Sequence, residues 1–251
     1  AAPAVGGPET VGEPDLPAEG AETGKAALPK EFINGVKLFN LGKYKKAKQC
    51  MYEALQVSPD LAKAHLYIGL MASEEKEYEE AKTSLEIFLK AEPDNLKAMM
   101  LLGKTYKSLR DWEHTAMVFG KISEWTPPPE PKVVQRAMRE LGLACIFLGQ
   151  NPDAIDILSR VCNSDPADSE STFYLATAYF NLEDYGQAKA VVNELLKQVS
   201  EEDKFFRMAH SLNDKIDQAL AETQPDPGPD GNEPDPAPPD AGTPPPETPE
   251  S

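Results

Sequence analysis

Few residues of this chain have the types and spacing that enzyme chemistry requires. The three histidines, His65, His114 and His210, lie far apart, and none has a second metal ligand four residues away. The sequence contains no glycine-rich phosphate loop and no Gly-x-Ser-x-Gly nucleophile turn. We therefore expect no enzymatic activity, no cofactor and no metal, and we interpret the histidines as surface or packing residues.

The three cysteines, Cys50, Cys145 and Cys162, are odd in number and widely spaced. This spacing argues against a disulfide framework and against a zinc site, so we interpret them as small apolar core residues. No stretch of the sequence approaches the roughly 18 apolar residues of a membrane-spanning helix.

A run of glutamates is the densest group of carboxylates in the chain. It consists of Glu74, Glu75, Glu77, Glu79 and Glu80. We interpret the run as a solvated helix end, with a weak calcium site as the alternative.

Charge is distributed unevenly along the 251 residues, which carry a net charge of −17. Residues 1–27 contain five acids and one base, and residues 222–251 contain eight acids and no base. Both ends are rich in proline and poor in apolar residues, so they are expected to be disordered acidic linkers. An acidic chain repels phosphate backbones, which makes nucleic acid a poor partner.

Between the two ends of the chain, glycine and proline recur at regular intervals, which indicates repeated units. Gly35, Gly69 and Gly103 are 34 residues apart, and Gly142 follows after 39. Pro59, Pro93, Pro127 and Pro166 show the same spacing, which places one five-residue insertion near 126–134. Five repeats follow: 28–61, 62–95, 96–129, 135–168 and 169–202.

Each repeat has room for two helices of about 13 residues joined by a short turn. A small residue stands twelve positions after each glycine, and an apolar residue stands sixteen after it, as in Met51, Leu85 and Phe119. The small residues would let the two helix axes approach closely. The Leu-Gly pairs at 41–42 and 148–149 stand where the turn should fall.

These columns resemble the tetratricopeptide repeat over about residues 28–202. The resemblance implies an all-α fold, a right-handed superhelical solenoid of about five helix pairs with disordered tails. The aromatic residue often found early in the first helix is replaced here, which loosens the match. The replacements are Glu31, His65, Met99, Met138 and Thr172.

Two segments should depart from the regular array. An apolar stripe over 203–221 predicts a final helix that closes the last exposed face, with Ser200 as its N-cap. The proline-rich segment 126–131 should interrupt the stacking and delay the next helix until Lys132 or later.

Family geometry further implies a concave groove, lined by the first helix of each repeat, that binds another protein. The predicted groove residues are Phe32, Val36, Leu66, Tyr67, Leu70, Lys97, Met100, Leu101, Lys104, Lys107, Arg136, Arg139, Leu143, Phe147, Phe173, Tyr174 and Phe180. Their mixture of apolar and basic groups suggests a partner segment that is apolar or amphipathic and acidic. The alternative is a tight superhelix in which the aromatic groups pack on one another.

The leading functional hypothesis is a protein-interaction scaffold. The Pro/Ala/Gly/Glu-rich start without methionine suggests a bacterial envelope protein, periplasmic and held at the outer membrane by a lipid on a cysteine before Ala1. By analogy, such repeat lipoproteins serve pilus, secretion or motility machines. The alternatives are a cytoplasmic adaptor, a regulatory subunit of an enzyme complex, or a self-assembling array; the oligomeric state is left open.

Overall fold

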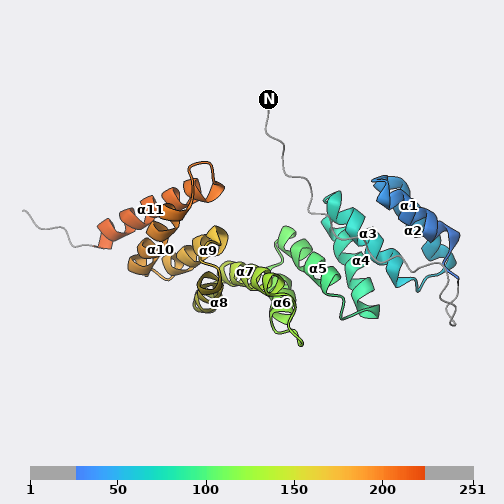
Figure 1. Ribbon diagram of the computed structural model, residues 1–251, viewed down its shortest axis with the longest axis horizontal. Helices are drawn as coiled ribbons and strands as arrows, with labels where there is room; N and C mark the ends of the chain where they lie inside the picture. The colour runs from blue at the N-terminus through green and yellow to red at the C-terminus, as the bar shows by residue number, and fades with distance from the viewer. Residues whose placement is uncertain (1–26, 224–251) are drawn as a thin grey trace, which may run out of the picture. The chain divides into compact units, whose positions relative to one another are not determined.

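The computed structural model describes residues 27–223, and within that range every regular element is an α-helix (Figure 1). The predicted disordered tails lie outside the described residues, apart from a few positions at their inner ends. The helices are α1 (Lys30–Asn40), α2 (Tyr44–Val57), α3 (Ala62–Glu74), α4 (Tyr78–Ala91), α5 (Leu96–Ser108), α6 (Trp112–Ser123), α7 (Pro131–Phe147), α8 (Asn151–Ser164), α9 (Ser169–Asn181), α10 (Tyr185–Gln198) and α11 (Lys204–Thr223).

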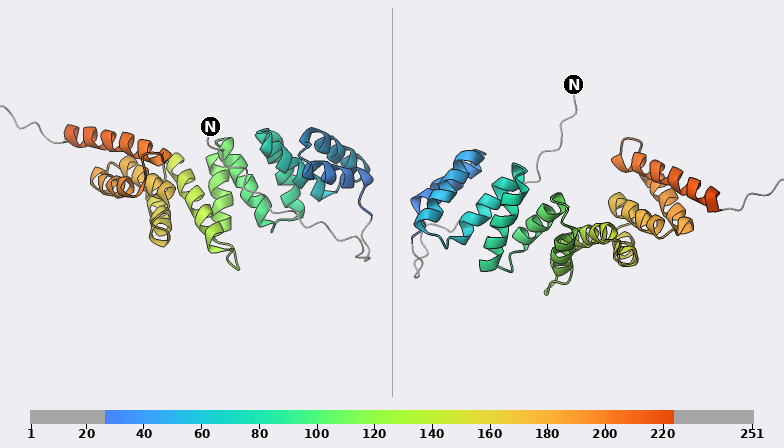
Figure 2. Two further views of the ribbon diagram at one scale, coloured as in Figure 1. Left: turned by 45° about the horizontal axis from the view of Figure 1, so that its top comes forward. Right: turned by 180° about the vertical axis from the view of Figure 1, so that it is seen from behind.

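The first six helices pack as consecutive pairs, and each of these pairs packs on the next. The helices α1 and α2, α3 and α4, and α5 and α6 are such pairs, and α2–α3 and α4–α5 contacts link them (Figures 1 and 2). The chain forms two compact units that divide after Ala144. Unit 1 holds α1–α6 and most of α7, and unit 2 holds α8–α11. The predicted all-α array of helix pairs is confirmed.

The glycine column marks the closest approach within each pair. A Cβ atom on Gly69 would lie 2.7 Å from Leu85, and one on Gly103 would lie 2.8 Å from Phe119. Leu85 and Phe119 are both fully buried. The column sixteen residues after each glycine therefore fills the space that the missing side chain leaves, which is the physical reason for the pairing seen in the sequence.

The turn between the two helices of a pair uses one residue in the left-handed conformation. Positive φ angles occur at Gly42 (69°), Lys76 (62°), Arg110 (59°), Gly149 (75°) and Glu183 (61°). The positions have the same 34- and 39-residue spacing as the glycine column. The sequence predicted this turn only at Gly42 and Gly149, because non-glycine residues occupy the others.

Replacing Arg110 by glycine should stabilise unit 1. A residue other than glycine in the left-handed region lowers the stability of the fold by roughly 1–2 kcal/mol. Glycine removes this strain but loses more chain entropy on folding, so we expect a net gain of about 1 kcal/mol. The measurement is the urea midpoint at unchanged m-value. The matched control is Ser108→Gly, two residues earlier at the last position of α5, which should lose up to about 0.5 kcal/mol. A loss of similar size in both variants would contradict the conformational argument.

The helix after the proline-rich segment begins earlier than predicted. Helix α7 starts at Pro131 rather than at Lys132 or later. Proline fits the first turn of a helix because the N–H that it lacks would have no intrahelical partner there. The predicted interruption of regular stacking stays a prediction, although one hydrophobic core spans the insertion. Ala137 joins the core around Phe119, and Val133 packs against it, so the core continues across the insertion.

The predicted final helix is present as α11. It packs on α10 and α9, and its buried residues Ala209, Leu212 and Ile216 share a core with Val192. The Ser200 N-cap prediction is wrong. Residues 200–203 form a turn closed by the Asp203 N–H donating to the Ser200 carbonyl at 2.9 Å. The Asp203 carboxylate instead accepts from the backbone of Phe205 at 2.8 Å.

Candidate protein-binding surfaces

The first helices of unit 1 lie side by side. Helix α3 contacts both α1 and α5. The next first helix, α7, is joined to α5 by an ion pair in which Lys107 Nζ lies 2.7 Å from Glu140 Oε2. The predicted groove residues of α1, α3, α5 and the first part of α7 therefore stand on neighbouring helices.

The α1–α3 part of the predicted groove is filled by its own side chains. Phe32 and Val36 are each 4% exposed, and Tyr67 is 5% exposed. The Phe32 and Tyr67 rings meet edge to face at 5.7 Å between centroids, and Phe39 meets Tyr67 at 5.1 Å. These contacts match the tight-packing alternative, and a ligand that leaves the packing intact cannot reach these three residues.

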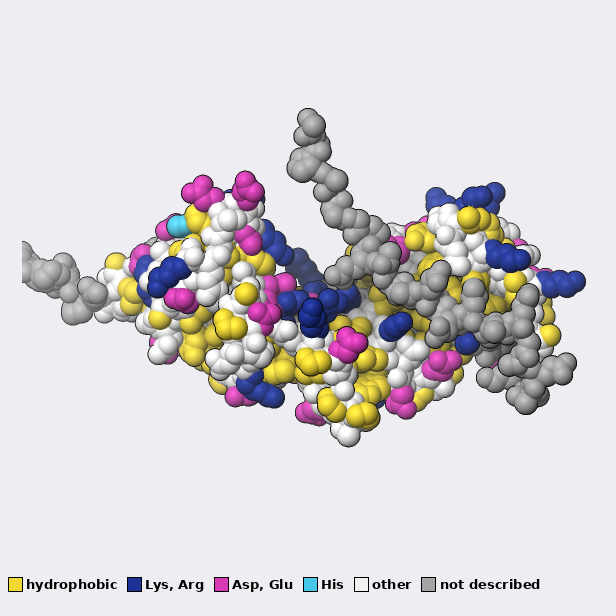
Figure 3. Space-filling model, in the orientation of Figure 1, with side chains coloured by type: hydrophobic (Ala, Val, Ile, Leu, Met, Phe, Trp, Pro, Cys, Tyr) yellow, Lys and Arg dark blue, Asp and Glu magenta, His cyan; other side chains and the backbone are white. Residues whose placement is uncertain are grey.

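Helix α5 carries the most accessible part of the predicted groove. Its residues Lys97, Met100, Leu101, Lys104 and Lys107 are here named the α5 stripe. Lys97 and Lys104 are exposed, and Met100 and Leu101 are half-buried against the unit 1 core. Leu66 and Leu70 on α3 are also half-buried. Figure 3 shows lysine and arginine side chains gathered around α5. The stripe therefore combines an apolar floor with exposed positive charge.

The basic residues nearer α7 are less available. Arg136 and Arg139 are half-buried, and Lys107 is paired with Glu140, a carboxylate that is 6% exposed. Leu143 is buried. Lys97 and Lys104 are thus the predicted basic residues that an incoming ligand meets first.

In unit 2 the predicted aromatic residues also take part in internal packing. The Phe173 ring lies 5.9 Å from Phe205 of α11, and Phe180 lies 5.6 Å from Tyr185. The Tyr174 hydroxyl donates to Glu170 at 2.9 Å. Phe147 is 58% exposed. The role of all seventeen predicted residues in binding stays a prediction.

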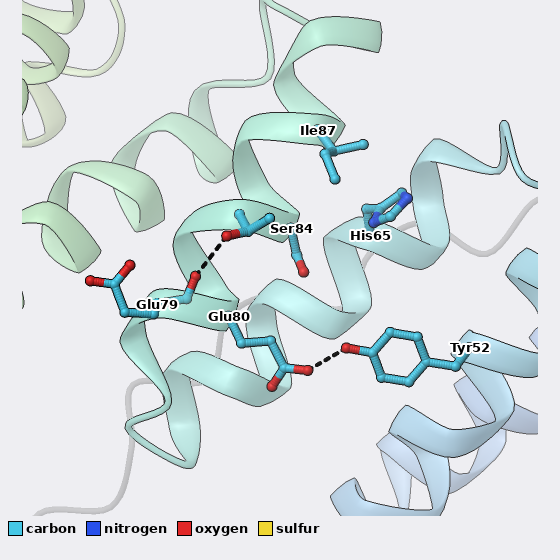
Figure 4. Close-up of a pocket in the computed structure, with 7 residues that line it drawn as sticks. Tyr52, His65, Glu79, Glu80, Ser84 and Ile87 are labelled. Carbon is cyan, nitrogen blue, oxygen red and sulfur yellow. Dashed lines mark hydrogen bonds between the residues drawn. The ribbon is translucent and has the colours of Figure 1, made fainter.

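A pocket that no sequence motif marks lies among α2, α3 and α4 (Figure 4). Its volume is about 440 Å³. It is lined by Tyr52 from α2, His65 from α3, and Glu79, Glu80, Thr83, Ser84 and Ile87 from α4. Burial lowers the pKa of His65, so its ring is neutral at pH 7. Lining positions from three helices have no fixed sequence spacing, which is why no motif marked them.

The glutamate run forms part of a contact between repeats. The Lys48 ammonium lies 2.9 Å from Glu75 and 2.8 Å from Glu80, and it also pairs with Glu77. Glu80 accepts a hydrogen bond from the Tyr52 hydroxyl. The Lys48 side chain is 13% exposed. The prediction of a purely solvated face is therefore wrong for these carboxylates, because Lys48 of the preceding repeat reaches them.

The electrostatics of this Lys48 cluster follow from those hydrogen bonds. Burial alone would lower the pKa of Lys48, but its bonds to Glu77, Glu80 and Glu75 raise it above the ordinary value. Burial together with the bond to Glu80 raises the pKa of Tyr52 to about 12. Burial opposes the charge on Glu80, yet the bonds from Lys48 and Tyr52 lower its pKa. The cluster is therefore charged at neutral pH.

Metal ligands and long apolar helices are the remaining features of residues 27–223 that bear on function. No group of three or more His, Cys, Asp or Glu side chains in that range could hold a metal ion. No helix there has the length and hydropathy needed to cross a membrane.

The sequence matches a known family in the first two repeats. The family described as Tetratricopeptide repeat matches residues 38–61 and again residues 63–95. Residues 38–95 therefore contain tetratricopeptide repeats. Both matches fall on the helices that carry the Lys48 cluster. Tetratricopeptide repeats generally form protein-interaction scaffolds without catalytic activity, and this fold supports that role. No curated protein sequence matches the chain.

Several solved structures resemble the fold, among them one described as a TPR protein. YrrB, described as having an unusual peptide-binding site, shares 16% identity at a TM-score of 0.64 over 74% of this chain and 92% of its own. A MamA structure shares 17% identity at 0.58, covering 67% and 89% of the respective chains. MamA AMB-1 shares 18% identity at 0.59, covering 71% and 94%. At these identities the similarity concerns the fold alone.

Proposed function

We propose that this tetratricopeptide-repeat protein is a non-catalytic scaffold whose α5 stripe binds a partner segment. The partner segment is amphipathic, with apolar side chains for Met100 and Leu101 and carboxylates for Lys97 and Lys104. The observation that carries the proposal is the exposure of two lysines beside half-buried apolar residues in a chain of net charge −17. In an acidic protein, a local positive stripe attracts acidic partners, which the negative surface elsewhere on the chain repels.

The spacing of the stripe favours a helical or extended partner laid along α5. Lys97 and Lys104 are seven residues apart, which places them on one helix face with Met100 and Leu101 between them. An amphipathic helix can place apolar side chains against Met100 and Leu101, and acidic side chains near Lys97 and Lys104 on either side of them. Tyr67 and Phe32 pack against each other in a separate core of α1–α3, so they are not part of the proposed contact with the partner.

Reversing both exposed lysines should abolish partner capture. The double variant Lys97→Glu, Lys104→Glu replaces attraction by repulsion, and we expect at least a tenfold loss of partner, or roughly 1.4 kcal/mol or more. The measurement is quantitative mass spectrometry of proteins retained from a detergent extract of the source cell. The matched control is Lys45→Glu, Lys46→Glu on α2, where both lysines are exposed outside the stripe.

A partner retained equally by the wild type and the α5 variant would place binding elsewhere and overturn the proposed site. Loss in both variants would show that general charge, rather than the stripe, governs capture. Raising the salt concentration should weaken the specific partner's binding, because surface charges are screened within about 8 Å at physiological ionic strength.

We also propose that the scaffold serves an envelope assembly of the pilus, secretion or motility type, tethered to the outer membrane. Support comes from the Pro-, Ala-, Gly- and Glu-rich composition of residues 1–27, which is typical of a flexible tether. The test is fractionation of source cells with an antibody against the repeat region. Recovery in the outer-membrane fraction supports the proposal, and recovery in the cytoplasmic fraction refutes it.

A further inference from the structure

The pocket on α2, α3 and α4 combines apolar walls with hydrogen-bonding groups that have no partner. Tyr52 is 44% exposed and Ile87 is 38% exposed, so both offer apolar surface to a ligand. Figure 4 shows Ile87 and His65 facing each other, with Tyr52 pointing toward Glu80 from the neighbouring α2. The volume of about 440 Å³ lies within the range of ligand-binding pockets, roughly 300–1,000 Å³.

Ser84 and His65 are polar side chains of this pocket that make no hydrogen bond to another described residue. Ser84 is only 6% exposed, and its hydroxyl has no hydrogen-bond partner among the residues that the structure describes. The half-buried His65 ring also lacks one within residues 27–223. A neutral imidazole and a hydroxyl can both accept hydrogen bonds. The Ser84 hydroxyl oxygen is not among the fully enclosed unpartnered atoms, so a donor on a ligand can reach it.

The charge around the pocket is negative. Glu79 and Glu80 line the pocket (Figure 4), and Glu75 and Glu77 are joined to Glu80 through their shared partner Lys48. Two ammonium groups compensate them: Lys48 as described above, and Lys82, whose Nζ lies 2.6 Å from Glu79. The balance attracts a cation, whereas an anionic ligand would meet uncompensated carboxylates.

We infer that this pocket binds an arginine side chain presented by a partner protein. The aliphatic stem lies along Ile87, and the guanidinium stacks on the Tyr52 ring. The guanidinium presents five N–H donors, which match the acceptors of Ser84, His65 and Glu80. Lysine fits less well, because a compact ammonium group neither stacks on a ring nor spans separated acceptors. This site is separate from the α5 stripe, so either can fail alone.

The test is a methyl NMR titration of the full chain carrying ¹³C-labelled isoleucine methyl groups. The probes are acetyl-arginine N-methylamide and its uncharged citrulline isostere. The Ile87 methyl reports the pocket, and Ile33, which is 43% exposed on α1, reports non-specific binding. We expect the arginine probe to shift Ile87 saturably and not Ile33. The citrulline probe should bind at least about tenfold more weakly because it lacks charge-assisted hydrogen bonds.

Two variants sharpen the test. Thr83→Arg changes an exposed residue on the pocket wall, so its own guanidinium should occupy the site and abolish the shift of Ile87. Met117→Ala removes an apolar side chain that is 60% exposed on α6, outside the pocket, and should leave binding unchanged. Equal shifts at Ile87 and Ile33, equal affinity for citrulline, or undiminished binding by Thr83→Arg would each overturn the inference.

Discussion

The Gly103→Ala variant is expected to unfold at a lower urea concentration than the wild type, although alanine is the better helix former. The added Cβ would stand 2.8 Å from the Phe119 ring, which is fully buried and cannot swing into solvent. Overpacking costs about 1–3 kcal/mol, against a gain of up to about 1 kcal/mol in helix propensity. We therefore expect a net loss of about 1–2 kcal/mol in the free energy of unfolding.

The control for Gly103 is a second helical glycine with space around it. A Cβ on Gly120 of α6 would meet nothing closer than Leu141 at 4.0 Å. Gly120→Ala should therefore stabilise the protein by about 0.5–1 kcal/mol. Phe119→Leu combined with Gly103→Ala should recover part of the loss, giving a favourable coupling in a double-mutant cycle. Stabilisation by both alanine variants would contradict the close-packing explanation.

The Lys48→Ala variant is expected to be among the most destabilised single variants on the surface of unit 1. Its loss leaves Glu75, Glu77 and Glu80 clustered without their shared counter-charge. Removing one partner of a buried ion pair costs about 3–5 kcal/mol, and because these carboxylates are partly solvated we expect about 2 kcal/mol.

The penalty of Lys48→Ala should depend on pH. In the wild type the folded pKa of Glu80 is lowered, so the stabilisation is present above the unfolded pKa of about 4.3 and is lost as the pH falls through the folded value. In the variant, protonation instead relieves repulsion among the carboxylates. The difference between the two proteins should thus be large at pH 7 and shrink below about pH 4.

Urea unfolding of both proteins at pH 7 and pH 3.5 measures this difference, with the pH values chosen around the unfolded pKa of about 4.3. The matched control is Lys189→Ala, which breaks a single ion pair at 2.5 Å to Asp217, a carboxylate that is 54% exposed. It should cost about 0–1 kcal/mol at either pH. A pH-independent penalty for Lys48→Ala would show that lost packing of its methylene groups, rather than charge, is responsible.

Much of the fold follows from local sequence signals. The 34-residue columns place each glycine against the residue sixteen positions later, and Gly69 against Leu85 shows that this spacing reports a real contact. The turns at Lys76, Arg110 and Glu183 could not be predicted, because no residue preference marks a left-handed position that a non-glycine residue occupies. The helix start at Pro131 was misplaced, since proline both breaks helices and begins them.

The candidate sites are less visible in sequence, because they depend on side-chain packing between repeats. Tyr67 and Lys97 were both predicted to line the groove because of their positions on the first helices of their repeats. In the structure, neighbouring rings bury Tyr67, whereas Lys97 is exposed. Likewise, the glutamate run gave no sign that Lys48 lies against it. Lys48 is 27 to 32 positions away from the glutamates that it pairs with. Only the packing of α2 against α3 and α4 brings Lys48 and these glutamates together.

The hydrogen bonds that join neighbouring repeats connect residues at similar, short separations along the chain. Lys48 and Glu80 are 32 positions apart, Lys107 and Glu140 are 33, and Lys189 and Asp217 are 28. Each such contact closes a loop of about one repeat, so ordering one helix pair on another has a small and nearly constant entropic cost. Folding can begin at any pair and spread to its neighbours, and low contact order makes that process fast. The terminal pairs, which have a neighbour on one side only, should open first and exchange their amide protons soonest.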